Sequence, residues 1–219
     1  MKETAKKKVR PYTLKYWIYI TEEQFVMVLA ASVIFTLWMF LIDGGDGLQE
    51  MISNLPFCFL FMFFVFLEVN GIRGICTNTA RAVSLGSTRR EAFFGGQLQS
   101  IVYLVQGIII YILLAGCTRN IRSILLYIGS MIFINGVTQI TGGMVVKTED
   151  KVISVVSSMV LFLVIVVYLA LIAGSEEGLP LTFLYTNQYL TVIFSVGVAL
   201  HILGIFIMWR NITDLEVKL

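Results

Sequence analysis

The chain alternates between long apolar runs and short polar breaks. Six runs come close to the ~20 residues that a helix needs to cross a hydrocarbon layer of about 30 Å. They cover residues 24–42, 52–70, 97–115, 123–146, 152–173 and 188–209. Because every backbone polar group inside lipid needs a partner within the protein, each run predicts a transmembrane helix. The pattern predicts an all-α membrane protein with six spans, although only residues 147–151 separate the fourth span from the fifth.

The composition supports this class. Of the 219 residues, 58% are hydrophobic and 14% are charged, whereas soluble domains average about 25% charged residues. A formal net charge of +2 gives no reason to expect a nucleic-acid partner. The three cysteines lie in unrelated settings, which argues against a disulfide framework or a metal cluster. We therefore treat residues 24–209 as one transmembrane domain that binds no metal or cofactor itself.

Residues 1–23 mix cations with aromatic rings, a composition typical of the lipid headgroup layer. The cations are Lys2, Lys6, Lys7, Lys8, Arg10 and Lys15, and the rings are Tyr12, Tyr16, Trp17 and Tyr19. We predict a basic tail followed, over 13–23, by an interfacial amphipathic helix that lies on the membrane and leads into the first span. The alternative, a disordered basic tail, fits residues 1–10 better than the residues that follow.

Positive charges predict the orientation. With the N-terminus inside, fourteen of the sixteen Lys and Arg residues lie in inner segments, and only Arg119 and Arg122 lie in outer loops. The positive-inside rule then makes both termini cytoplasmic, including the tail 210–219. The outer stretch 179–185 is apolar but too short to span. It either dips into the outer leaflet or forms a surface loop with a few buried side chains.

The longest polar break, residues 71–96, has a built-in order. Residues 77–85 have helical spacing, and Gly86 suits a left-handed helix stop because it lacks a Cβ. Thr88 and Glu91 form a capping box, so a new helix is expected near Arg89. A short helix, a glycine corner and a capped restart make a shaped surface. The plainer alternative is a cytoplasmic loop held down by basic residues.

Two spans carry polar stripes. Gln99, Tyr103 and Gln106 share one face of the third span, beside Ser100 and Gly107; Asn135, Thr138, Gln139 and Gly142 share a face of the fourth. Polar residues in lipid face other helices, water or a substrate. The candidates for a translocation path are Gln99, Tyr103, Gln106, Asn135 and Gln139, but hydrogen bonding between helices is the favoured interpretation of each stripe.

Two further polar residues stand alone in apolar surroundings. His201, the single histidine, lies between Gly197 and Gly204 at helical spacing, which favours a packed, hydrogen-bonded core residue. Glu68 lies near the inner end of the second span. It either gates a path or, more simply, pairs with Arg73 or Arg81.

Enzyme chemistry finds little support. The chain has no G-x-x-x-x-G-K-[ST] phosphate loop, and its serines lie in no G-x-S-x turn. We therefore predict no enzymatic activity of the chain alone. Any energy from ATP has to come from another subunit.

The stretch 85–94, LGSTRREAFF, resembles the coupling region of permease subunits of type 2 ATP-binding-cassette (ABC) exporters, in the small bacterial form with six spans and no fused ATPase. The order of an interfacial helix, six spans and a hydrophobic outer segment between spans five and six is also similar. The architecture covers nearly the whole chain, whereas the motif covers about ten residues. The polar stripe on span three departs from the family's pattern.

The resemblance implies a function and partners. Two permease subunits, identical or paralogous, would enclose a path for an amphipathic, lipid-like, peptide or antibiotic substrate in the bacterial cell membrane. Two ABC ATPase subunits would bind ATP and Mg²⁺ and dock on a cytoplasmic coupling helix between spans two and three. The implied docking residues are Arg81, Leu85, Gly86, Thr88, Arg89, Arg90, Glu91 and Phe93, with Leu85 and Phe93 as apolar anchors.

Two alternatives belong to other classes. A six-span solute-binding subunit of a vitamin-type ABC importer also borrows its ATPases, but its polar side chains should converge near the outer face. An intramembrane enzyme, such as a protease, would be active as an isolated chain.

Overall fold

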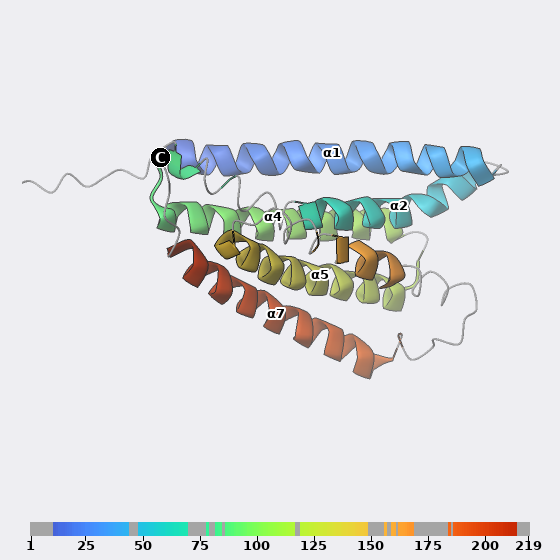
Figure 1. The fold of residues 1–219 in the computed structure, drawn as a ribbon. Helices are drawn as coiled ribbons and strands as arrows, with labels where there is room; N and C mark the ends of the chain where they lie inside the picture. The colour runs from blue at the N-terminus through green and yellow to red at the C-terminus, as the bar shows by residue number, and fades with distance from the viewer. Residues whose placement is uncertain are drawn as a thin grey trace, which may run out of the picture.

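The computed structural model describes residues 11–43, 48–69, 78, 82–84, 86–116, 119–148, 156, 159–160, 162–168, 184 and 186–213. Its long elements are α1 (Pro11–Asp43), α2 (Leu48–Val69), α4 (Arg89–Ala115), α5 (Ile121–Thr148) and α7 (Asn187–Thr213). They lie roughly along one common direction (Figure 1). The described regular structure is helical throughout, which confirms the all-α prediction.

Within the part of the chain that the structure describes, five helices are long and apolar enough to cross a membrane: Lys15–Ile42, Met51–Val69, Arg89–Ala115, Ile121–Met144 and Asn187–Asn211. Each contains the ~20 apolar residues that the hydrocarbon layer requires. The chain is therefore a multi-pass membrane protein. Of the fifth expected span, 152–173, the described residues 156, 159–160 and 162–168 are helical, and the remainder lies outside the described residues.

Helix α1 corrects one expectation about the N-terminal region. The sequence predicted a helix over 13–23 that lies on the membrane before a separate span over 24–42. The structure instead forms one continuous 33-residue helix, about 50 Å long at ~1.5 Å per residue. One straight helix cannot lie in the membrane plane and also cross it, so 13–23 extends the axis of the span (Figure 1).

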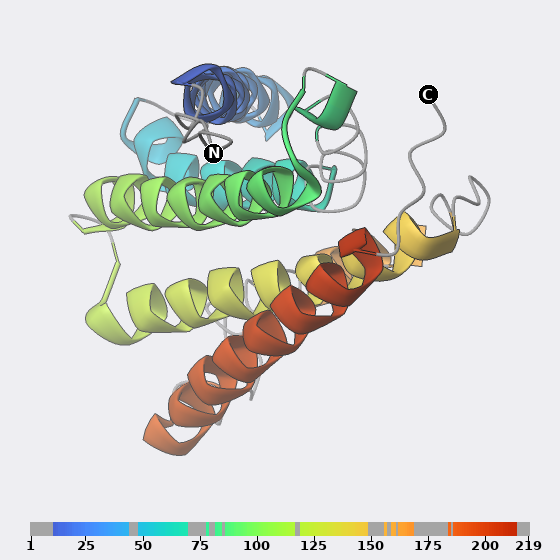
Figure 2. The same ribbon diagram turned by 90° about the vertical axis from the view of Figure 1, so that its left-hand side faces the viewer.

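The helices form two groups. Helices α1, α2 and α4 pack together, and α5 packs most extensively against α7 (Figure 2). The core of the first group is aromatic: the ring of Phe63 on α2 stacks on Tyr103 of α4 with centroids 4.9 Å apart. Gly107 gives the Phe63 ring room, because a Cβ there would overlap it.

The second group is held by glycines. Gly129, Gly136 and Gly143 recur every seven residues on α5 and face α7. A Cβ on Gly136 would lie 2.9 Å from the backbone O of Gly197 and the backbone N of His201. Small residues let two backbones approach closely, which strengthens packing in membranes.

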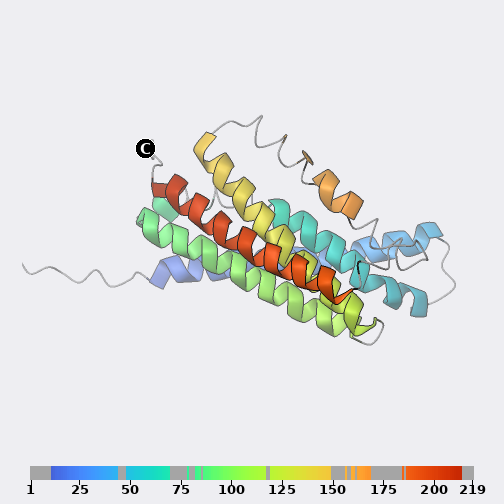
Figure 3. The ribbon, with the colours of Figure 1, turned by 90° about the horizontal axis from the view of Figure 1, so that it is seen from below.

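Helices α5 and α7 run in the same direction, as Figure 3 also shows. Gly129 faces Ile193 near the start of both helices, and Gly143 faces Met208 near the end of both. Asn211 confirms the register, since its Nδ2 donates to the Gly143 carbonyl at 2.6 Å. The end of α5 and the start of α7 therefore lie at opposite ends of the bundle.

Candidate coupling surface and interhelical polar network

The corner before α4 is a closed helix stop, as the sequence predicted. Residues 82–84 are helical, and Gly86 adopts φ of 92°. The N–H of Gly86 donates to the Val83 carbonyl at 2.9 Å, and the N–H of Ser87 donates to the Ala82 carbonyl at 3.0 Å. These two bonds form a Schellman motif, which satisfies carbonyls that the ending helix leaves open.

Helix α4 begins after Thr88, two residues beyond Gly86, through the predicted capping box. The Glu91 N–H donates to Thr88 Oγ1 at 3.2 Å, and the Thr88 N–H donates to Glu91 Oε2 at 2.8 Å. Thr88 is the N-cap and Arg89 the first helical residue. The prediction of a glycine corner and a capped restart is confirmed. The expected docking residues Arg81 and Leu85 lie outside the described residues.

The N-terminal part of α1 holds the inner side of this corner. Trp17 is 2% exposed and clusters with Ala82 and Ala92. Gly95 lies directly against its indole ring, so that a Cβ on Gly95 would overlap the ring. The expectation that Trp17 sits among lipid headgroups is therefore wrong, because the ring packs inside the protein.

The outer side of the corner combines cations with one exposed ring. The guanidinium of Arg90 lies 5.8 Å from the ring centroid of Phe94, which is 54% exposed. Phe93, expected to be an apolar anchor for a partner, is only 4% exposed. It packs edge-on against Trp209 of α7 with centroids 4.9 Å apart, because it points toward the bundle from the first turn of α4. Of the two adjacent rings, the exposed one is therefore Phe94.

Charges separate along the bundle. Lys15, Arg89, Arg90 and Arg210 lie at the corner end. At the opposite end, Arg119 lies between α4 and α5, and Arg122 lies in the first turn of α5. The described cations that the sequence assigned to inner segments thus lie at one end of the bundle, and those assigned to outer loops lie at the other.

Just beyond the corner, a hydrogen-bonded network joins α4 to α5 and α7. Gln97 Nε2 donates to Gln139 Oε1 at 3.2 Å, and Gln139 Nε2 donates to Ser100 Oγ at 2.6 Å. Ser100 Oγ donates to Asn135 Oδ1 at 3.0 Å, and the Asn135 amide contacts His201 Nδ1 at 3.2 Å. Because an amide nitrogen is a donor, His201 Nδ1 accepts this bond.

The network confirms two interpretations of the sequence. Asn135 and Gln139, both 1% exposed, bind neighbouring helices, as expected for helix packing. His201 is a hydrogen-bonded residue between closely packed helices. Sequence reasoning missed Gln97, which it treated only as the first residue of a span; the signal was its i, i+3 spacing from Ser100. Whether any of these residues also lines a path stays a prediction.

The other stripe residues of α4 face the first group of helices. Gln99 Nε2 donates to Gln24 Oε1 of α1 at 2.8 Å. The Tyr103 hydroxyl and Gln106 Oε1 are buried without a hydrogen-bond partner among the described residues. The stripe therefore divides between two helix groups: Ser100 faces α5, and Gln99, Tyr103 and Gln106 face α1 and α2.

Glu68, near the end of α2, is a buried carboxylate with 4% exposure. Its two expected partners, Arg73 and Arg81, lie outside the described residues, so the pairing stays a prediction.

No protein-family model, curated protein or solved structure matches this chain. The described residues supply a rigid corner with an exposed cation and ring, and a polar connection from the helix that begins there to the α5–α7 pair. Such an arrangement suits the transmission of force from one end of the bundle.

Proposed function

We propose that the chain is a permease subunit of an ABC exporter that uses ATP hydrolysed by a separate ATPase subunit. One observation carries the proposal. The corner between α2 and α4 is closed by a Schellman motif and a capping box, is buried on its inner side against Trp17, and presents Arg90 and Phe94 outward. A corner fixed in this way presents Arg90 and Phe94 in one geometry, as a docking surface requires.

The topology supports six crossings. Because α5 and α7 are parallel, the chain has to return along the bundle between residues 148 and 187. The described helical residues 162–168 fit this return: Ile165 is buried in the core, Tyr168 shares a hydrogen bond with Ser130 of α5 at 2.8 Å, and Phe162 contacts Phe61 of α2. Six crossings, with the corner end and its cations facing the cytoplasm, satisfy the positive-inside rule.

The mechanism follows from how the corner joins the helices. Two permeases, identical or paralogous, would flank a path, and two ATPases would dock on the corners. ATP-driven closure of the ATPases would push each corner. Because α4 begins at Arg89 without a flexible joint, the push reaches Gln97 and Ser100 and, through the network, the α5–α7 pair. Packed interfaces respond to such a push by switching between discrete arrangements.

The direct test is whether an ABC ATPase binds the corner. The chain, purified in mild detergent from its native membranes, should retain an ABC ATPase subunit in equal amount, identified by mass spectrometry. The reconstituted complex should hydrolyse ATP, whereas the isolated chain should not. A stable chain that retains no ABC ATPase would contradict the proposal.

Variants locate the contact. Gly86→Val should lose most of the retained ATPase, because a β-branched residue tolerates positive φ poorly. Phe94→Ala should weaken retention by about tenfold or more, since truncation of a central aromatic anchor commonly costs 2 kcal/mol or more. Arg119→Ala, at the opposite end, is the control and should change neither retention nor hydrolysis.

A further inference from the structure

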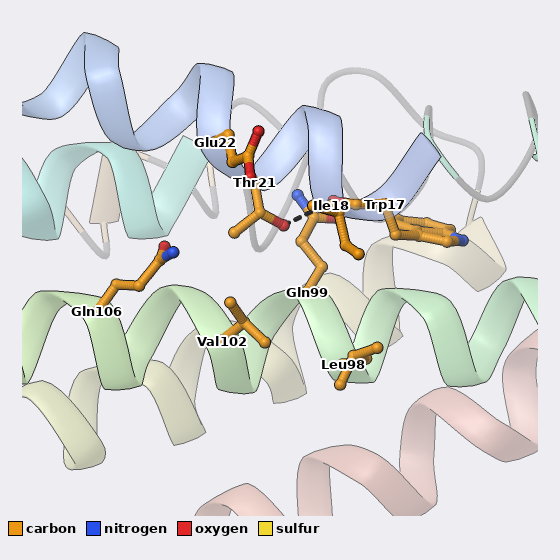
Figure 4. Close-up of a pocket in the computed structure, with 8 residues that line it drawn as sticks. All are labelled: Trp17, Ile18, Thr21, Glu22, Leu98, Gln99, Val102 and Gln106. Carbon is orange, nitrogen blue, oxygen red and sulfur yellow. Dashed lines mark hydrogen bonds between the residues drawn. The ribbon is translucent and has the colours of Figure 1, made fainter. Parts of the chain in front are cut away.

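A groove runs between α1 and α4 on the outside of the first helix group, close to the corner (Figure 4). Four side chains from each helix line it: Trp17, Ile18, Thr21 and Glu22 from α1, and Leu98, Gln99, Val102 and Gln106 from α4. Its outer rim is apolar and open, with Ile18 47% and Leu98 41% exposed. The cavity of about 60 Å³ is several times the ~10–15 Å³ that one water needs, which suits a small headgroup.

The polar atoms left open toward this groove are acceptors. The Trp17 indole N–H, which is also buried without a hydrogen-bond partner among the described residues, lies against Gly95, a residue that does not line the groove. Thr21 Oγ1 already donates to the Trp17 carbonyl at 2.7 Å, and Gln99 Nε2 already donates to Gln24. Gln106 extends from α4 toward α1 (Figure 4), and its buried Oε1 has no partner among the described residues. The Glu22 carboxylate accepts only. A ligand that completes this groove therefore has to supply hydrogen-bond donors.

The position of the groove adds a second requirement. Helices α1 and α4 run side by side in the same direction, with Trp17 against Gly95 and Phe25 against Tyr103. Glu22 lies just before residue 24, where the sequence places the start of the hydrocarbon layer. A carboxylate at this depth is costly unless it is hydrated or paired. Among the described residues, no cation pairs with Glu22. The groove therefore combines a negative group at the lipid boundary with an apolar rim.

We propose that this groove binds amphiphiles with a primary ammonium headgroup. The ammonium has three N–H donors, which match the Glu22 carboxylate and Gln106 Oε1, and its alkyl tail lies along Ile18 and Leu98 in the membrane. Such an amphiphile is either an aminophospholipid of the bilayer or a cationic substrate. As the lateral access site of an exporter, a role that rests on the proposed function, the groove would select cationic amphiphiles from the inner leaflet.

The test uses Trp17 as a reporter from within the groove. In a Trp38→Phe, Trp209→Phe background, the full chain is placed in phosphatidylcholine nanodiscs and titrated with dodecylamine carrying a bromine-labelled tail. Saturable quenching of Trp17 fluorescence measures binding. Glu22→Gln and Gln106→Leu should each weaken binding by about tenfold, because the first removes the charge that attracts the ammonium and the second removes a hydrogen-bond acceptor.

Matched controls isolate the site. Glu23→Gln, an exposed neighbour outside the groove, should change the affinity by less than twofold. Brominated dodecyltrimethylammonium has the same charge but no N–H donor and should bind about tenfold more weakly. If Glu22→Gln binds dodecylamine like the parent protein, or if the trimethylammonium probe binds equally well, the proposal is wrong.

Two further comparisons distinguish a bilayer lipid from another cationic amphiphile as the ligand, and distinguish failure of the binding site from failure of the proposed function. Nanodiscs containing phosphatidylethanolamine raise the apparent Kd if the natural occupant is a bilayer lipid, and leave it unchanged if the occupant is a different cationic amphiphile. The titration needs no ATPase. Failure to retain an ABC ATPase therefore removes the proposed function and the exporter role of the groove, and leaves the binding site standing.

Discussion

The α1–α4 contact and the α5–α7 contact join two pairs of parallel helices by opposite means. At the first, the large Trp17 side chain fills the space against Gly95, and a groove stays open beside it. At the second, glycines bring the two backbones within contact distance at Gly136, and side chains such as Phe194 pack beside this contact. The first contact can be weakened by truncating one large side chain. The second is weakened by adding even one methyl group to a glycine.

This difference suggests separate roles. We expect the α5–α7 pair to move as one unit, because rotation of either helix at Gly136 would bring backbone against backbone. The α1–α4 contact leaves room for a ligand. Between them, Gln97 and Ser100 make α4 the helix that belongs to both groups.

The largest expected effect on stability follows from removing the Trp17 side chain, which packs against the inner side of the corner. Trp17→Ala should lower the free energy of unfolding by about 3–5 kcal/mol, as expected for a buried aromatic ring replaced by Ala. SDS-induced unfolding in bicelles, followed by circular dichroism, measures it. Tyr19→Ala is the control, since Tyr19 is 64% exposed on the same helix and should cost less than 1 kcal/mol. Equal losses of unfolding free energy for the two variants would contradict the proposed role of Trp17 in holding the corner.

The second prediction tests the backbone contact. Gly136→Ala should cost about 1–3 kcal/mol through overpacking, because its Cβ would meet backbone atoms that cannot turn away. Gly96→Ala is the matched control: it is also a helical glycine, but its Cβ would lie 3.8 Å from Trp17, an ordinary contact. It should be neutral or stabilising by up to ~1 kcal/mol. A stabilising Gly136→Ala would show that α5 and α7 are not in close contact.

How much of this arrangement the sequence predicts depends on how local each feature is. The helix stop at Gly86 and the box of Thr88 and Glu91 involve neighbours within five residues, so sequence spacing was enough. The inward turn of Phe93 depends on Trp209, more than a hundred residues away. No local pattern distinguished Phe93 from Phe94.

Two other features depended on signals of a different kind. The continuity of α1 through Glu22 and Glu23 was missed because charged residues were taken as a boundary between an interfacial helix and a span. The seven-residue repeat of Gly129, Gly136 and Gly143 was visible in the sequence. Its partner helix was not, because the repeat alone does not tell which helix packs against it.

The smallest expected effect is at the link between the two groups. Ser100 accepts from Gln139 and donates to Asn135, so Ser100→Ala leaves two buried amides short of one partner each. Hydrogen bonds between transmembrane helices average about 0.6 kcal/mol, and an unsatisfied buried group costs about 1–3 kcal/mol. We expect a loss of about 0.5–2 kcal/mol in the same unfolding assay. Ser195→Ala, at an exposed serine of α7, should stay within about 0.5 kcal/mol.

A double-mutant cycle decides whether this loss belongs to the link between α4 and α5. If Ser100 and Gln139 act as one unit, Gln139→Leu should cost less in the Ser100→Ala background than in the parent protein. The expected coupling is about 0.5–1 kcal/mol, within the range for residues of one hydrogen-bond network. Gly129→Ala combined with Ser100→Ala should instead be nearly additive, because Gly129 contacts Ile193 and Phe194 of α7 and lies six residues, about 9 Å along the helix, before Asn135. Additive losses for Ser100 and Gln139 would mean that their hydrogen bond contributes nothing to the link between α4 and α5. A push on the corner would then have to reach α7 through Gln97, whose Nε2 donates to Gln139 of α5 and lies 3.0 Å from Met208 Sδ of α7.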